Sequence, residues 1–234
     1  MAIRSRWTVV SLVALLSVMA LIMGGAATAT PPSQPHRLLI NLDEPDGWPD
    51  AMSPTDLTIG SSSAPITLVE YVSPMCPHCA QFESEAGRRL RSEYVDTGRV
   101  RFAFRELPVG IPDLSIAMFQ VARCGNATPE VYVERVTHLM TAANAINAGY
   151  ARELYRERLI SFAQTLGLSA DQASHCIDDA TGARRAQWSE GYAIGNYGIY
   201  AAPTFVLNGQ VLNVHSSEQV FSALDVALEN HRRN

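Results

Sequence analysis

A strand-like run of β-branched and aromatic residues leads directly into a Cys-Pro-His-Cys motif, and this junction constrains the fold more than any other part of the sequence. Ile66–Val72 has the composition of a buried strand, which residues 73–75 end. A helical pattern then opens at Cys76 and continues to about Tyr94, and Val100–Arg105 has the composition of a second strand. A strand, a helix and a strand within about 40 residues predict a βαβ unit, in which the two strands are parallel neighbours.

The rest of the chain shows a long helical block and then a return to strands. The pattern is helical from residue 111 to about residue 196, and strands are predicted at residues 204–207 and 210–213. The dipeptide Asn208-Gly209 between these strands is preferred in type I′ turns, so they are expected to form a β-hairpin. A closing helix is predicted over residues 216–230. Within the block, helices are expected at residues 113–124, 129–142, 151–166, 170–179 and 182–197.

This order of elements predicts an α/β fold class with an inserted all-helical domain. Residues 54–110 and 197–234 supply the β-α-β and β-β-α parts of one domain, and residues 111–196 form the insertion. Residues 43–65 are rich in Asp, Pro, Ser and Gly, so they are predicted to be irregular. A short edge strand is predicted at residues 37–42.

The first 29 residues have the layout of a secretory signal peptide. Two arginines precede the apolar run Trp7–Met23, and Ala27-Thr28-Ala29 matches an A-x-A cleavage pattern. An uncleaved membrane anchor is the alternative, because the apolar run is long for a signal core and short for a bilayer span. In either case the remaining chain is expected in the periplasm or another extracytoplasmic space, with residues 30–53 as a linker.

The composition indicates a globular protein without a nucleic-acid-binding surface. Hydrophobic residues make up 47% of the 234 residues and charged residues 18%, which separates the chain from disordered proteins. The formal net charge is −5, and the basic residues are scattered arginines. Nucleic-acid binding requires a concentrated positive patch, so this partner class is excluded.

Cys76 is predicted to lie at the start of a helix, where a thiolate is stabilised. The first turn of a helix carries unsatisfied N–H groups and about half a positive charge. Pro77 is tolerated there because its missing N–H has no role, and His78 adds a donor and partial positive charge beside the sulfur. Cys79 lies three residues later on the same face, so the two cysteines can form a disulfide that exposes the first sulfur and shields the second.

A stabilised thiolate at Cys76 favours redox chemistry. It makes this sulfur a good leaving group from a mixed disulfide, and it stabilises the reduced form, so the disulfide becomes a stronger oxidant. A zinc knuckle is one alternative, although zinc usually needs two clustered pairs of ligands and the chain has a single Cys-x-x-Cys. An inert structural bridge is the other. The histidines show no metal-ligand spacing, so no metal is expected.

The active-site region resembles that of DsbA-like thiol:disulfide oxidoreductases, a thioredoxin-fold family with a helical insertion. The resemblance rests on Val69-Glu70-Tyr71 followed by the Cys76–Cys79 motif, and on Ala202-Pro203-Thr204-Phe205 about 125 residues later. It covers about residues 54–230 and includes the Asn-Gly hairpin and the helical block. The resemblance implies a thioredoxin-like fold for the α/β domain.

The resemblance also implies roles for individual residues. Cys76 would be the nucleophile that forms mixed disulfides, and Cys79 would be the resolving cysteine. Pro203 would follow a cis peptide bond and pack against the disulfide, and the backbone beside it, including Ala202, would pair with an extended substrate. The family commonly has Thr or Val before this proline, so Ala202 departs from the pattern, which affects substrate preference and redox properties.

Glu70 lies six residues before Cys76, where thioredoxin-like proteins often carry a buried acid. Leu68, Glu70 and Val72 share one face of a strand that is expected to be covered on both sides. A buried carboxyl would have a raised pKa and could relay the proton of Cys79. The alternative is a solvated Glu70 on a half-exposed strand.

Cys124 and Cys176 both lie in the helical block and are interpreted as a structural disulfide. Four cysteines allow three connectivities, and an exported protein tends to pair its thiols. A second redox relay is the alternative, although neither cysteine has a second cysteine nearby in sequence.

These features predict an exported enzyme that introduces disulfide bonds into folding proteins. Its substrates would be reduced exported proteins, and the resemblance implies reoxidation by a membrane partner of the DsbB type. No cofactor is expected beyond the Cys76–Cys79 disulfide, and contact with a membrane is expected only if the leader is retained. A disulfide isomerase or reductase, and a non-catalytic binding or chaperone-like module, are the alternatives.

Overall fold

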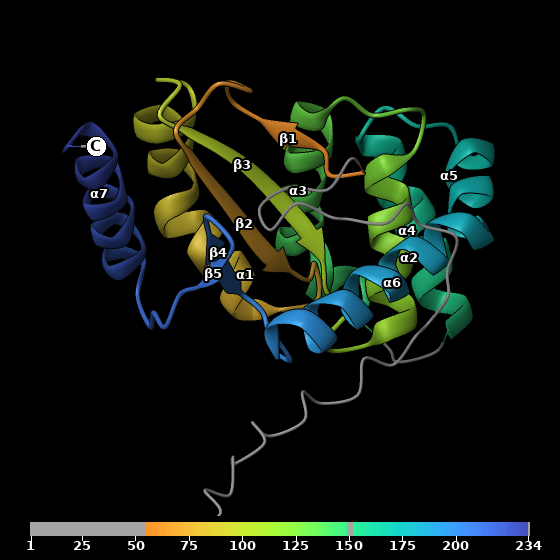
Figure 1. Ribbon diagram of the computed structural model, residues 1–234. Helices are drawn as coiled ribbons and strands as arrows, with labels where there is room; N and C mark the ends of the chain where they lie inside the picture. Colours follow the sequence, from red (N-terminus) through yellow and green to blue (C-terminus); the bar gives the residue numbers. More distant parts are fainter. Residues whose placement is uncertain (1–54, 149–151, 234) are drawn as a thin grey trace, which may run out of the picture. The chain divides into compact units, whose positions relative to one another are not determined.

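A five-stranded sheet lies at the centre of the computed structural model, which describes residues 55–148 and 152–233 (Figure 1). The strand order is β1-β3-β2-β4-β5. β2 and β3 are parallel, and the other neighbouring pairs are antiparallel, which confirms the βαβ unit. The strands are β1 (Thr58–Ile59), β2 (Ile66–Val72), β3 (Val100–Glu106), β4 (Thr204–Leu207) and β5 (Gln210–Val211).

Strand β2 is buried on both faces of the sheet. Its residues pair with β3 on one side and β4 on the other, so that Glu70 lies between Phe104 and Phe205. Leu68 and Val72 belong to the larger core cluster, whereas the alternate residues Val69 and Tyr71 belong to a second cluster on the opposite face. Glu70 therefore projects toward the larger core.

The helix after β2 is continuous from Pro77 to Val95, as the sequence predicted, and three of its segments differ in their hydrogen-bond pattern. These are α1 (Pro77–Phe82) and the two π-helical segments η1 (Glu83–Gly87) and η2 (Leu90–Val95). The η1 segment contains the buried residue Glu83. A Cβ atom on Gly87 would lie 2.5 Å from Glu83 Oε2, so glycine leaves the space that this carboxylate occupies.

Five helices of the described chain connect β3 to β4, as the predicted helical insertion requires. Their ends carry sequence-encoded caps: Ser169 and Gln172 form a capping box, and Gly198 ends the last helix in the left-handed conformation with φ 64°. A final helix, α7 (Ser217–Arg233), follows the hairpin. The five helices are α2 (Pro112–Arg123), α3 (Pro129–Ile146), α4 (Arg152–Thr165), α5 (Ala170–Ile177) and α6 (Ala180–Tyr197).

The expected hairpin is present, and one strand was missed. Asn208 and Gly209 both have positive φ, 47° and 79°, as a type I′ turn requires. Residues 43–65 were predicted to be irregular, but β1 lies among them and pairs antiparallel with β3. Two residues are too few to produce a periodic pattern, so only the pairing reveals this strand.

The predicted leader, linker and edge strand at residues 37–42 lie outside the described residues. Within residues 55–148 and 152–233, none of the helices combines the length and apolar character that crossing a membrane requires.

Candidate active site at the start of helix α1

Cys76 is the N-cap residue of α1 and has extended backbone dihedrals, φ −91° and ψ 114°. Its N–H donates to the carbonyl of Ser73 over 3.0 Å, which closes the turn after β2. Its carbonyl accepts hydrogen bonds from the N–H groups of Cys79 and Ala80 at 3.1 and 3.2 Å, and Pro77 occupies the first helical position. The end of β2 and the first turn of α1 therefore hold this sulfur at the helix N-terminus.

A distant segment completes the site. The peptide bond between Ala202 and Pro203 is cis, and the Cys76 thiol donates to the Ala202 carbonyl oxygen over 3.1 Å. Strand β4 begins at Thr204, which pairs with Tyr71 of β2, so the sheet brings this loop to the start of α1. The structure thus places Cys76, Ala202 and Pro203 together although the chain separates them by 126 residues or more.

The turn before Cys76 is stabilised by Ser73, whose hydroxyl group makes three hydrogen bonds. Ser73 Oγ lies 3.0 Å from the Val109 carbonyl oxygen, 2.9 Å from Ser115 Oγ and 3.2 Å from the Met75 N–H. A hydroxyl offers one donor and two acceptor positions, so Ser73 donates to Val109 and accepts from Ser115 and Met75. Because Ser115 belongs to α2, the helical insertion takes part in positioning the turn.

The environment of Cys76 stabilises its thiolate. A hydrogen bond from the Cys79 thiol, aided by the backbone N–H groups of Cys79 and His78 and by the charge of His78, lowers the pKa of Cys76 to about 6. Partial burial opposes this shift. Pro77 and His78 are themselves exposed.

The two sulfurs differ strongly in their protonation, and both cysteines are reduced. Burial raises the pKa of the Cys79 thiol, and the neighbouring Cys76 and Glu70 raise it further. Cys79 is fully buried, as expected, but Cys76 is also only 7% exposed. The prediction of an exposed first sulfur was therefore wrong, because the Ala202–Pro203 loop lies against it.

Glu70 is fully buried on the same side of the sheet as the cysteines, which excludes the solvated alternative. Neither of its carboxyl oxygens has a hydrogen-bond partner among the described residues. Burial raises its pKa well above the usual value, and the nearby Glu83 raises it further. The raised pKa favours the protonated form of this carboxyl, which makes Glu70 a candidate proton donor.

Glu83 is a second buried acid that the sequence analysis did not single out. Its Oε2 atom accepts hydrogen bonds from Arg91 at 2.8 Å and from Thr137 of α3 at 3.2 Å. Arg91 pairs with Glu83, so Glu83 carries the charge that disfavours ionisation of Glu70. The missed signal was its position four residues after Cys79, which places it on the same helix face.

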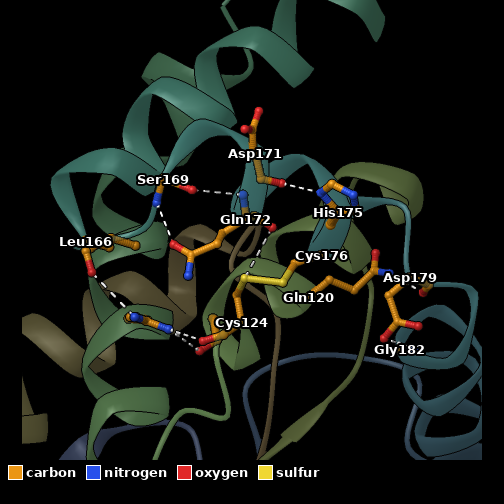
Figure 2. Close-up of a disulfide and its surroundings, with 12 residues drawn as sticks. Gln120, Cys124, Leu166, Ser169, Asp171, Gln172, His175, Cys176, Asp179 and Gly182 are labelled. Atoms are coloured by element: carbon orange, nitrogen blue, oxygen red, sulfur yellow. Dashed lines mark hydrogen bonds between the residues drawn. A yellow bond between two sulfur atoms is a disulfide. The ribbon is translucent and has the colours of Figure 1, made fainter.

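Cys124 and Cys176 form a disulfide in the helical block (Figure 2). It joins the residue that ends α2 to the last turn of α5, with 5.7 Å between the Cα atoms. Arg135 of α3 donates to the Cys124 carbonyl at 2.7 Å, so three helices meet at this point. Among the described residues, no group of three His, Cys, Asp or Glu side chains could hold a metal ion.

Comparisons with known proteins agree with this architecture. Residues 52–226 match the family model described as Thioredoxin. A "Putative protein-disulfide oxidoreductase" of Rickettsia conorii is 25% identical over 177 residues, which cover 76% of this chain and 62% of the relative. A protein of the same printed name from Rickettsia felis is 24% identical over 213 residues, which cover 87% of this chain and 70% of that relative. The chain thus spans about two thirds of the length of these relatives.

Solved structures show the same fold. The α-DsbA1 protein of Wolbachia pipientis superposes with a TM-score of 0.70 at 21% identity, covering 79% of this chain and 98% of that one. A protein-disulfide isomerase from Novosphingobium aromaticivorans superposes with a TM-score of 0.64 at 19% identity, covering 73% and 97%. Together with the family match, these likenesses confirm the predicted fold class. The chain belongs to the thioredoxin family and has the DsbA-like fold, a thioredoxin-like α/β domain with a helical insertion.

Proposed function

We propose that this chain is an exported protein-disulfide oxidoreductase that transfers the Cys76–Cys79 disulfide to reduced client proteins. One observation carries the proposal: Cys76 caps α1 with a pKa lowered to about 6, and its sulfur lies 3.1 Å from the carbonyl that precedes cis-Pro203. A thiol in this position has the acidity and the neighbouring backbone that thiol–disulfide exchange with an extended chain requires.

The reaction begins with the oxidised enzyme and a client dithiol. A client thiolate attacks Cys76 Sγ, which forms a client–Cys76 bond, breaks the Cys76–Cys79 bond and expels Cys79 as a thiolate. The pKa of Cys79 is raised, so this sulfur takes up a proton at once, and the buried carboxyl of Glu70, whose pKa is also raised, is the proton donor. A proton from solvent then restores Glu70.

The second step releases the product. The other client thiolate attacks the client sulfur of the mixed disulfide, which forms the client disulfide and expels Cys76. Cys76 leaves as a stable thiolate because its pKa is low. Overall the client dithiol loses two electrons and two protons, and the enzyme disulfide gains two electrons and one proton while the other proton passes to solvent.

The direction of transfer follows from the same asymmetry. Stabilising the Cys76 thiolate stabilises the reduced enzyme, so the enzyme disulfide is driven toward reduction and the client toward oxidation. This favours an oxidase over an isomerase or reductase. The proposal also includes reoxidation by a membrane partner of the DsbB type and a location outside the cytoplasm. It includes no cofactor other than the redox disulfide.

The test is oxidative refolding of a reduced model protein, comparing the wild type with Cys76→Ser. The wild type should accelerate the appearance of active substrate, and Cys76→Ser should reduce this to the uncatalysed rate. A matched Cys124→Ser/Cys176→Ser variant should remain active because it keeps the Cys76–Cys79 pair. Full activity in Cys76→Ser would overturn the proposal. Faster rescue of a scrambled substrate than of a reduced one would instead indicate an isomerase.

A further inference from the structure

Tyr200 is the most exposed large hydrophobic side chain among the described residues. It is 72% exposed, compared with 57% for the next, Val226. Its neighbour Ile199 is buried in the core cluster between the sheet and α6. An aromatic ring that is left in water beside a buried residue forgoes the stabilisation that packing would supply, and tyrosine is also enriched at protein interfaces.

The segment that carries Tyr200 is held at both ends. On one side, α6 ends at Gly198 and the Ile199 N–H donates to the Ala193 carbonyl at 3.0 Å. On the other side, Thr204 Oγ1 donates to the Ala201 carbonyl at 2.6 Å, and Thr204 opens β4. Tyr200 is therefore presented by a short anchored segment, which lowers the entropy that binding would cost.

Tyr200 also lies within reach of the reacting sulfur. Ala202, two residues later, contacts Cys76 Sγ through its carbonyl. Consecutive Cα atoms are about 3.8 Å apart, so the Cα atoms of Tyr200 and Ala202 are separated by at most about 7.6 Å. A client cysteine bonded to Cys76 thus brings its neighbouring residues close to the backbone segment that carries Tyr200.

The two sequence segments that meet at Cys76 Sγ contain no formally charged residue. Neither residues 73–80 nor residues 198–204 contain Asp, Glu, Lys or Arg. His78 is the one basic side chain in these two segments. Two segments without formal charge, one of which exposes an aromatic ring, fit an apolar or aromatic side chain, which reduced and unfolded proteins expose.

We infer that Tyr200 is a specificity-determining residue, whose ring contacts an apolar or aromatic side chain beside the reactive cysteine of the client. The inference rests on the proposed function and names the class of client that the site prefers. It assigns to Tyr200 a role in recognition and none in the exchange chemistry.

The experiment measures single-turnover reduction of the oxidised enzyme by two cysteine peptides that differ in one residue next to the cysteine, Phe or Ser. Wild type should react faster with the Phe peptide. Tyr200→Ala should reduce this preference by about 3- to 10-fold, the value of one aromatic contact, and Tyr200→Phe should retain it. Reduction by dithiothreitol should be equal in all three proteins, because this reagent has no side chain to recognise.

A Val226→Ala variant is the control, because it removes another exposed hydrophobic residue on α7. It should leave the peptide preference unchanged. An unchanged preference in Tyr200→Ala, or an equal slowing of both peptides and dithiothreitol, would overturn the inference. If wild type failed to oxidise dithiothreitol, the proposed function itself would be wrong, which is a separate and recognisable result.

Discussion

At the scale of single residues, the site depends on three ionisable groups whose surroundings shift their pKa values in different directions. Cys76 has a lowered pKa, whereas Cys79 and Glu70 have raised ones. The hydrogen bond from the Cys79 thiol and the N–H groups at the helix terminus favour the Cys76 thiolate, and burial disfavours ionisation of Cys79 and Glu70. These opposite shifts favour an anionic Cys76 sulfur beside protonated Cys79 and Glu70, as the proposed proton transfer from Glu70 to Cys79 requires.

Glu70→Gln should make folding stability less sensitive to alkaline pH. The folded-state pKa of Glu70 lies above its unfolded value, so the native state binds the extra proton and wild-type stability falls as pH rises above the unfolded pKa of about 4.3. The variant lacks this proton, so its stability relative to wild type should rise with pH, by at most about 1.4 kcal/mol per pH unit. Urea unfolding of both reduced proteins at pH 5 and pH 8 measures this change.

The quantity to compare is the difference in the free energy of unfolding between Glu70→Gln and wild type. Cys76 titrates in the same pH range, but to a first approximation it contributes equally to the stability of both proteins and cancels in this difference. Its lowered pKa alone would make the reduced protein more stable as pH rises through about 6. A constant difference in stability between variant and wild type from pH 5 to pH 8 would contradict the raised pKa of Glu70.

At the scale of elements, the helix that begins at Cys76 carries a buried carboxylate, Glu83. The η1 segment places Glu83 in the interior, and Gly87 leaves room for its carboxyl group. Arg91 of η2 and Thr137 of α3 hold Glu83 in position, so the helical insertion and the active-site helix share one polar contact. Ser115 of α2 makes a second such contact through Ser73.

Gly87→Ala should destabilise the protein by about 1–3 kcal/mol, because the added methyl group would lie 2.5 Å from Glu83 Oε2. Gly191→Ala in α6 is the matched control, since nothing lies within 4 Å of the position of its Cβ atom. Alanine is the better helix former, so the control should gain about 0.5–1 kcal/mol. Thermal or urea unfolding of the two variants gives the comparison, and equal effects would refute the steric argument.

At the scale of the whole molecule, the α/β domain carries the reacting groups and the helical block supports them. Both segments of the site come from the α/β domain, at β2–α1 and before β4. The Cys124–Cys176 disulfide lies in the block and closes a loop with a sequence separation of 52 residues. Its expected contribution is therefore to stability, through a smaller entropy of the unfolded chain.

Replacing both Cys124 and Cys176 by Ser should lower the free energy of unfolding by about 2–4 kcal/mol. The measurement is urea unfolding in a Cys76→Ser/Cys79→Ser background, so that a single disulfide is compared with none. A loss of thiol-exchange activity in the corresponding variant with Cys76 and Cys79 intact, without a loss of stability, would favour the alternative of a second redox relay.

The order of elements, the position of Cys76 at a helix start and the Asn208-Gly209 turn could be predicted from the sequence, because each depends on residues close together in the chain. Strand patterns, proline at the first helical turn and turn dipeptides act over a few positions. The resemblance to a known family added Glu70 and Pro203, which local physics alone would not single out.

Only the tertiary structure decided the features that require distant segments to meet. The short strand β1, the near-complete covering of Cys76 and the burial of Glu83 each depend on packing between elements. The hydrogen bonds of Ser73 also depend on packing, because their partners come from the loop after β3 and from α2. A sequence pattern records which face of an element is apolar, but the neighbour against that face, and hence the exposure and pKa of a buried group, follow from the folded arrangement.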